Sequence, residues 1–275
     1  MPMKYVFILL CISFFYSNCT IERKLYSPTQ VNNPSLQKKN NYSISATIST
    51  PTGFDINGGY AITNRFAIIA GVFNYRNNDN QQSYSIFSAN RDSSLLTYKH
   101  KGFHAGAGLY FPLSKNKSSE FIAFFGGYTK GNFDMREKLY HLTSSSRTPT
   151  LNYYKSDLNR WFLQASINSY HDVVHFSLIT RFNYVAYKNV NTDYDNNQQQ
   201  EINLPPYGYP EGSSFLDFSF DTKIFFSEKH KAGLQIFSVI TTRLNKKDLD
   251  FYIYPFRMGI GLFLNSPFTK NVPEK

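Results

Sequence analysis

The sequence predicts an all-β protein, an antiparallel up-and-down β-barrel of about ten strands. Apolar and polar residues alternate with a period of two in run after run, which is a strand pattern and not a helix pattern. Several runs reach roughly 10–14 residues, enough for a tilted membrane crossing, whereas ordinary strands average about 5–6 residues. Aromatic residues make up 17% of the 275-residue chain, and charged residues also only 17%. Tyr-rich, charge-poor strands are typical of a wall between water and lipid.

Residues 1–18 have the pattern of a secretory signal peptide. Lys4 precedes the apolar stretch 5–16, and Ser17-Asn18 leads into Cys19. This order predicts a lipoprotein-type cleavage, after which the Cys19 sulfur takes a diacylglycerol; the alternative is an ordinary signal peptide with an incidental cysteine. The other cysteine, Cys11, lies in the signal, so the mature chain can form no internal disulfide.

Behind the signal, the sequence divides into three parts. Residues 19–40 are polar and irregular, with Pro28 and Pro34, and we expect them to form a tether from the lipid to the barrel. Residues 41–265 carry the alternating pattern and form the barrel. Residues 266–275 form a C-terminal tail.

The alternation places five strands in the first half of the barrel, and the fourth is typical: Phe103, Ala105 and Ala107 alternate with His104 and Gly106. The second half repeats the pattern with five more. The expected strands are, in order, 42–50, 54–62, 66–75, 102–111, 121–130, 161–168, 174–184, 216–226, 231–242 and 251–264.

The connections alternate in length. Those after the second, fourth, sixth and eighth strands are short, whereas residues 76–99, 131–157 and 188–213 form long polar segments that we expect to be loops. Short turns at one rim and long loops at the other are typical of outer-membrane barrels. With the N-terminus in the periplasm, an even strand number returns the C-terminus to the same side, so both termini are expected to be periplasmic.

The polar face of the last four strands carries a set of charged residues. They are Arg181, Asp217, Asp221, Lys223 and Arg257, and the register directs all of them into the lumen. Charges in a lumen must pair or stay hydrated. They form either a structural ion-pair network or the lining of a selective or binding site; about ten strands enclose too little space for a wide pore.

The N-terminal part of the sequence resembles a known family. Cys19, Tyr26-Ser-Pro28, Asn32-Asn-Pro34 and Leu36, followed by Gly53-Phe-Asp-Ile-Asn-Gly-Gly-Tyr-Ala-Ile-Thr-Asn64, are similar to the start of uncharacterised outer-membrane lipoproteins of Bacteroidota-type bacteria. The resemblance covers about the first 75 residues. It implies a lipid-anchored β-barrel and transfers no active-site residues.

No pattern of catalytic or metal-binding residues stands out. There is no phosphate-binding glycine loop, zinc spacing or nucleophile elbow. His100 and His104 share a strand face but lie far apart for one metal, His171-Asp172 is expected in a turn, and His175 faces the lumen. We therefore expect no enzyme activity, metal or cofactor. The net charge of +10 is spread along the chain without a dense cluster, which argues against nucleic-acid binding and favours contact with anionic lipid headgroups.

Two functional interpretations follow. The first is a non-enzymatic outer-membrane lipoprotein barrel with a structural, interaction or narrow-lumen role, whose partners are membrane lipid and the anchor at Cys19. The second is a periplasmic or peripheral soluble barrel that binds a hydrophobic ligand. They differ in which face is apolar, because a membrane barrel turns its apolar face outward and a soluble barrel turns it inward. The sequence identifies no ligand or protein partner.

Overall fold

The computed structural model describes residues 21, 23–84, 91–113, 119–141, 148–171, 173–201, 204, 212–226, 231–244, 252–253 and 255–266. The expected signal peptide 1–18, the lipidation site Cys19 and residues 267–275 of the expected tail lie outside these residues. Among the described residues, no helix has the length and apolar character needed to cross a membrane.

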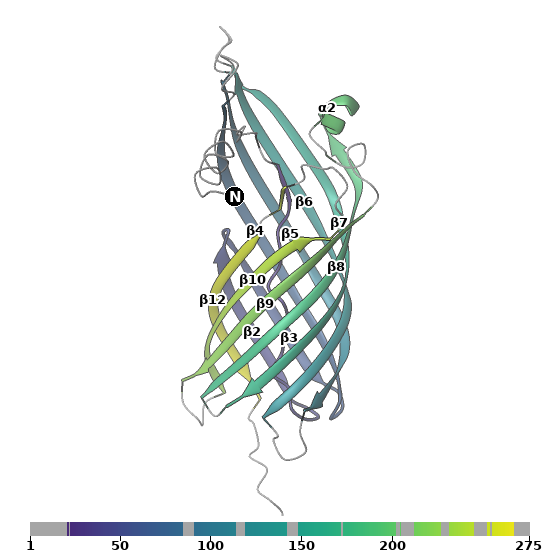
Figure 1. Ribbon diagram of the computed structural model, residues 1–275, viewed down its shortest axis with the longest axis vertical. Coiled ribbons are helices and arrows are strands. Elements are labelled where there is room, and N and C mark those ends of the chain that lie inside the picture. The colour runs from purple at the N-terminus through teal and green to yellow at the C-terminus, as the bar shows by residue number, and fades with distance from the viewer. Residues whose placement is uncertain are drawn as a thin grey trace, which may run out of the picture.

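Ten antiparallel strands form a closed barrel, which confirms the predicted fold class (Figure 1). Each strand pairs with its neighbours in sequence, and the last strand closes the barrel against the first. The barrel strands are β2 Tyr42–Thr50, β3 Gly53–Ala61, β4 Phe66–Tyr84, β5 Arg91–Pro112, β6 Glu120–His141, β7 Thr150–Tyr170, β8 Val174–Thr192, β9 Ser213–Phe225, β10 Ala232–Arg243 and β12 Phe256–Asn265.

Three small elements are not part of the barrel wall. Lys24–Tyr26 (β1) pairs in parallel with Tyr252–Ile253 (β11). The predicted last strand, 251–264, is thus divided into β11 and β12. A short helix, α2 (Asn196–Glu201), follows β8.

The wall of the barrel is uneven in height. Strands β4 to β8 have 19 to 22 residues, whereas β2 and β3 have 9 each. The long strands rise beyond the others at one end (Figure 1). We call this end the loop end, and the opposite end, with the short connections at 62–65 and 171–173, the turn end.

The extra length corrects the prediction of long loops at 76–99 and 131–157, and the predicted loop 188–213 begins with the last five residues of β8. Pairing of β4 with β5 continues through Asn74↔Lys101 to Tyr84↔Arg91, and β6 and β7 extend in the same way, so most of 76–99 and 131–157 is strand. In 188–213, the described strand residues are 188–192 and 213, and residues 196–201 form α2. The outward side chains become polar there, which weakened the apolar signal. Several inward positions there stay apolar, and Leu96, Tyr98, Met135 and Tyr154 are buried.

The two faces of the wall follow the predicted register. Successive strand residues point to opposite faces, so a single step reverses the environment. Arg257 is 0% exposed inside the barrel, and the next residue, Met258, is 49% exposed on the outer face. Large apolar side chains therefore cover the outside of the barrel, and polar and charged ones line the inside.

Residues 24–36, which belong to the segment expected to be a tether, lie inside the lumen, where residues 25–36 are buried. We call residues 24–36 the plug. Lys24 binds Asp79 near the loop end, and Leu36 packs with Ala61 and Ala67 near the turn end, where β2 begins. Beyond β1 the plug is irregular, as expected, and many of its polar groups form hydrogen bonds with the polar lining.

The plug determines at which end of the barrel the described part of the chain begins. Tyr42 and Asn265 both lie at the turn end, as the even strand number predicts, and Ser266 N donates to Tyr42 O. The plug then reverses the direction of the chain before β2. The described residues therefore start at the loop end and finish at the turn end.

Candidate functional site: the plugged lumen and the outer wall

Apolar side chains hold the plug at three levels. Near the loop end, Leu25 and Tyr26 enter a buried cluster with Leu96, Met135 and Phe215; the Tyr26 and Phe215 rings stack with centroids 4.1 Å apart. In the middle, Val31 packs with Ile179, Phe237 and Val239. Near the turn end, Leu36 joins a cluster that includes Tyr110, Phe121 and Tyr170. Each level closes part of the cross-section of the lumen.

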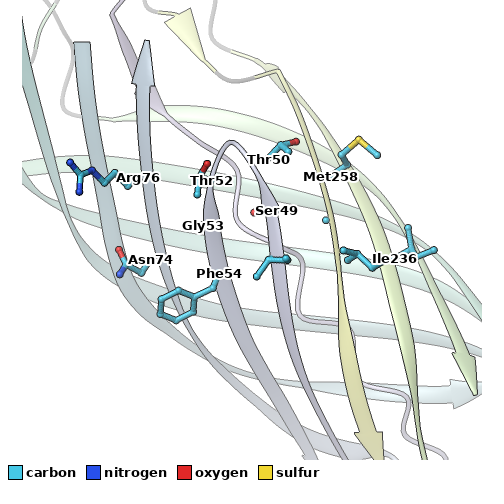
Figure 2. Close-up of a pocket in the computed structure, with 12 residues that line it drawn as sticks. Ser49, Thr50, Thr52, Gly53, Phe54, Asn74, Arg76, Ile236 and Met258 are labelled. Atoms are coloured by element: carbon cyan, nitrogen blue, oxygen red, sulfur yellow. The ribbon is translucent and has the colours of Figure 1, made fainter. Parts of the chain in front are cut away.

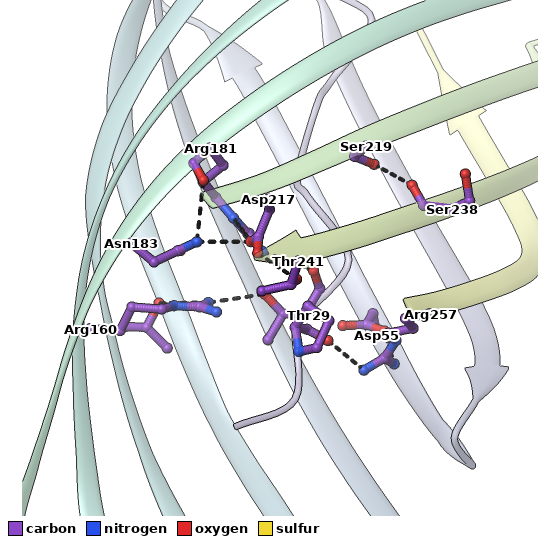
Figure 3. A network of polar contacts seen from close by, with 12 residues as sticks. Thr29, Asp55, Arg160, Arg181, Asn183, Asp217, Ser219, Ser238, Thr241 and Arg257 are labelled. Carbon is purple, nitrogen blue, oxygen red and sulfur yellow. Dashed lines mark hydrogen bonds and ion pairs between the residues drawn. The ribbon is translucent and has the colours of Figure 1, made fainter. Parts of the chain in front are cut away.

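Between the first two apolar levels, three arginines converge on the plug (Figure 3). Arg257 Nη1 donates to Pro28 O at 3.0 Å, and Arg181 Nη2 donates to Thr29 O at 2.9 Å. Arg160 Nη2 donates to Thr29 Oγ1, also at 3.0 Å. Irregular backbone inside a barrel needs partners for its carbonyl groups, and these donors supply them.

Two of these arginines also form buried ion pairs with the wall. Arg181 Nη2 lies 2.7 Å from Asp217 Oδ2, and Arg257 Nη2 lies 2.8 Å from Asp55 Oδ2. Asp217 further accepts hydrogen bonds from Asn183 and Thr241. Buried pairs are stabilised by further hydrogen bonds to their remaining polar groups, and here the plug carbonyls accept such bonds from both arginines.

Asp55 and Arg257 form a larger unit with Tyr75. The Tyr75 hydroxyl donates to Asp55, and the Arg257 guanidinium lies over the Tyr75 ring, with its Cζ 3.5 Å from the centroid. Ser49 accepts a further hydrogen bond from Arg257. The unit joins β3, β4, β12 and the plug.

A second polar level surrounds residues 30–35. Thr47 Oγ1 and Asn57 Nδ2 donate to Gln30 Oε1 at 2.7 and 2.8 Å. Asn32 Nδ2 donates to Gly58 O and Ala70 O, and its backbone oxygen accepts from Gln164. Lys223 Nζ donates to Asn33 O at 3.0 Å and Ser35 Oγ at 3.2 Å. The polar residues of the expected tether are thus the groups that match the polar lumen.

The loop end of the plug is held by charge. Arg23 forms an ion pair with Glu137 at 2.9 Å, and Lys24 Nζ lies 2.8 Å from Asp79 Oδ2. The Lys24 amide donates to the Tyr98 hydroxyl, and the Tyr194 hydroxyl donates to Glu137. Burial and the adjacent Glu137 raise the pKa of Tyr194, so this hydroxyl keeps its proton. The extended strands β4 to β6 provide these partners.

The structure places all five predicted lumen charges inside the barrel, where they take part in three ion pairs. Arg181 pairs with Asp217, whereas Lys223 lies 4.0 Å from Asp221, which accepts from Gln235. Arg257 pairs with Asp55 on β3, not with Asp217 or Asp221.

Asp55, Arg160 and the plug are missing from the predicted set. Asp55 and Arg160 alternate with apolar residues in the same register as the five, so extending the search to the earlier strands would have identified them. The plug gave no comparable signal, because a polar, proline-containing segment has no strand or helix periodicity.

The histidines are placed by packing. His104 lies inside, with its Nε2 3.4 Å from Asn32 Nδ2. The His100 ring packs edge-on against Phe73 and Tyr75. His175 lies 3.5 Å from Ser35 Oγ, and His171, beyond it, is exposed next to Ser169; Asp172 lies outside the described residues. The part of the chain that the structure describes contains no group of three or more His, Cys, Asp or Glu residues able to hold a metal ion.

The outer wall carries a continuous apolar belt. It consists of exposed outward side chains that include Ile44, Phe54, Ile68, Phe103, Phe124, Trp161, Leu178, Phe220, Ile236 and Leu262. On β4 to β8 the belt ends abruptly toward the loop end. The next outward residues there are polar or basic: Asn74, Lys101, Lys130, Asn159 and Lys188. These residues are neighbours across adjacent strands, because Asn74 pairs with Lys101, Lys130 with Asn159, and Lys188 with Asp157, two residues before Asn159.

Comparisons with protein-family models and with curated proteins find no match to this chain. Among solved structures, the chain is similar to the crystal structure of BauA, the ferric preacinetobactin receptor from Acinetobacter baumannii, with 13% sequence identity and a TM-score of 0.34. The alignment covers 90% of this chain and 48% of the receptor chain, so the chain spans about half the receptor's length.

Proposed function

We propose that this chain is a non-enzymatic outer-membrane β-barrel lipoprotein that is closed by its own N-terminal segment and uses its loop-end wall for interactions. The observation that supports this proposal is the combination of an apolar belt outside with a plug inside. Large exposed apolar surfaces are not tolerated in water unless another apolar phase covers them. A belt that runs round a barrel and ends at a polar edge matches a lipid bilayer.

The soluble ligand-binding alternative has little support. A soluble barrel that carries a hydrophobic ligand needs an apolar interior with free space. Here Arg257, Asp55, Arg181 and Asp217 occupy the interior, and the plug fills the space between them. A soluble barrel would bury Met258 inside and expose Arg257 to water, whereas here Met258 is exposed outside and Arg257 is buried inside.

The direction in which the plug runs through the lumen affects the side of the membrane on which we expect the lipid anchor. If the loop end faces outward, as in outer-membrane barrels, Ile21 and Arg23 lie on the outer side. The lipid that the sequence predicts at Cys19 is attached two residues before Ile21. We therefore propose that the anchor belongs to the outer leaflet, in place of the periplasmic N-terminus expected from strand number.

Conductance across a planar bilayer tests whether the plug closes the lumen. The wild-type protein is expected to insert without steady conductance. In a variant with Leu25→Asp, Val31→Asp and Leu36→Asp, all three apolar levels are disrupted, and conductance is expected to appear. Leu151→Asp, on the exposed outer face of β7, serves as a control and should stay closed. A conducting wild-type protein would contradict the proposed closed barrel.

A further inference from the structure

The outward face of β4, β5 and β6 carries a group of basic residues directly above the apolar belt. Arg76 and Lys99 are register partners, Lys101 follows on the same face of β5, and Lys130 lies on β6 diagonal to Lys101. All four side chains are exposed. We call these four residues the basic cluster.

Few negative charges lie close enough to balance the positive charge of the basic cluster. Asp134 is the register partner of Lys99, but its Oδ1 lies 3.5 Å from Arg136 Nε, with which it forms an ion pair. No ion pair joins the four cluster residues to a carboxylate within the described ranges. Like charges directly opposite on adjacent strands destabilise a sheet. An anion between Arg76 and Lys99 would remove that repulsion.

An apolar groove begins at the same place. It has a volume of about 820 Å³ and lies across the short β2–β3 hairpin, with Arg76 and Asn74 at one side and Ile236 and Met258 at the other (Figure 2). Ile48 and Phe54 line it between these sides. All four of these apolar residues belong to the exposed outer surface.

We propose that the basic cluster and the groove together bind one phosphate-bearing acylated lipid of the loop-side leaflet. The phosphate lies at Arg76, Lys99 and Lys101, and an acyl chain lies in the groove. Arginine forms paired hydrogen bonds with phosphate oxygens, and the lysines add positive charge. Arg76 contributes to both parts, so a single molecule with a charged head and an apolar tail fits the arrangement.

Lipid retention measured by native mass spectrometry tests this proposal. The probes are phosphatidic acid and a diacylglycerol with the same chains, added to the intact protein in detergent. The wild-type protein is expected to retain phosphatidic acid in preference to diacylglycerol. A variant with Arg76→Gln, Lys99→Gln and Lys101→Gln should lose at least about tenfold in affinity for phosphatidic acid, because the charge attraction is removed.

A control with equal charge change is available at the turn end. Lys39→Gln, Arg65→Gln and Lys231→Gln alter three exposed residues there and should leave retention unchanged. In the groove, Thr50→Trp should block the acyl chain, whereas Thr180→Trp, on the outer face of β8, should not. Circular dichroism confirms that each variant retains its β-structure.

Three outcomes would overturn the lipid site. Equal retention of diacylglycerol would show that phosphate is not recognised. Equal losses in the two charge variants would show that position does not matter. Displacement of phosphatidic acid by inorganic phosphate or dextran sulfate at similar concentration, with no effect of Thr50→Trp, would show a soluble anion as the partner. The proposal rests on the membrane location proposed above, but its failure is distinguishable: a failed lipid site leaves membrane insertion intact.

Discussion

The ion pair between Arg257 and Asp55 illustrates what a single residue contributes to this barrel. Both side chains are buried, 2.8 Å apart, and each makes further contacts with Tyr75. Removing one member of a buried pair leaves the other charge without a partner, which costs more than the pair itself contributes.

Arg257→Ala is therefore expected to lower the free energy of unfolding by about 3–5 kcal/mol, measured by denaturant titration in lipid vesicles. The double variant Arg257→Met with Asp55→Asn removes both charges and should recover part of this loss. Arg65→Ala, exposed in a turn, should change stability by no more than about 0.5 kcal/mol. Equal effects of Arg257→Ala and Arg65→Ala would show that Arg257 is hydrated and not buried.

A second residue-scale prediction concerns pH at the loop end of the plug. Burial acts to raise the pKa of Asp79, but hydrogen bonds from Lys24 and Gln81 and the charge of Lys24 outweigh it, so the pKa lies below its usual value of 3.8. The carboxylate therefore stabilises the folded state above about pH 4, and this contribution disappears as the pH falls through the lowered pKa.

Hydrogen exchange of residues 24–26 should accordingly increase below pH 4 in the wild-type protein. Because the pair is partly exposed, the effect is expected to be at most about 1 kcal/mol. In Asp79→Asn the exchange at neutral pH should already be raised and should lack this step. An unchanged step in Asp79→Asn would assign it to another group.

At the scale of elements, the fit between the plug and the wall depends on small residues. Gly59 faces the plug, and a Cβ at this position would lie 2.5 Å from the Cβ and Cγ atoms of Pro34. The rigid proline ring cannot yield as a long side chain can. The adjacent Gly58 has its nearest such contacts at 3.7 and 3.9 Å, which is ordinary packing.

Gly59→Ala is expected to displace the plug around Pro34 and raise hydrogen exchange at residues 32–36, while the barrel strands stay protected. Gly58→Ala is the matched control and should leave that exchange unchanged. If both variants behave alike, the plug does not lie against Gly59.

Elements also show where sequence reasoning succeeded and where it failed. Alternation was sufficient to identify ten strands and their faces, because strands have a side-chain period of two and the belt is strongly apolar. It failed above the belt, where outward residues such as Arg76, Lys99 and Asn132 are polar and the strands look like loops. It also failed for the plug, whose position depends on contacts with distant residues such as Arg181 and Lys223.

At the scale of the whole molecule, an apolar belt, a lumen occupied by the plug and an extended loop-end wall occur together. The five lumen charges predicted from the last strands lie in this interior, but their partners include Asp55 and the plug carbonyls, which lie far away in sequence. The sequence alone could predict on which face of the wall each charged residue lies. The partner of each charge is given only by the closed structure.

The fluorescence of Trp161 tests the membrane location most directly. It is the only tryptophan in the chain, is 62% exposed on the outer face of β7, and lies next to the polar edge formed by Asn159. In vesicles of lipids with brominated acyl chains, its emission is expected to be blue-shifted and strongly quenched, because the indole contacts lipid. A water-like emission without quenching would contradict the account of this chain as a membrane-spanning barrel.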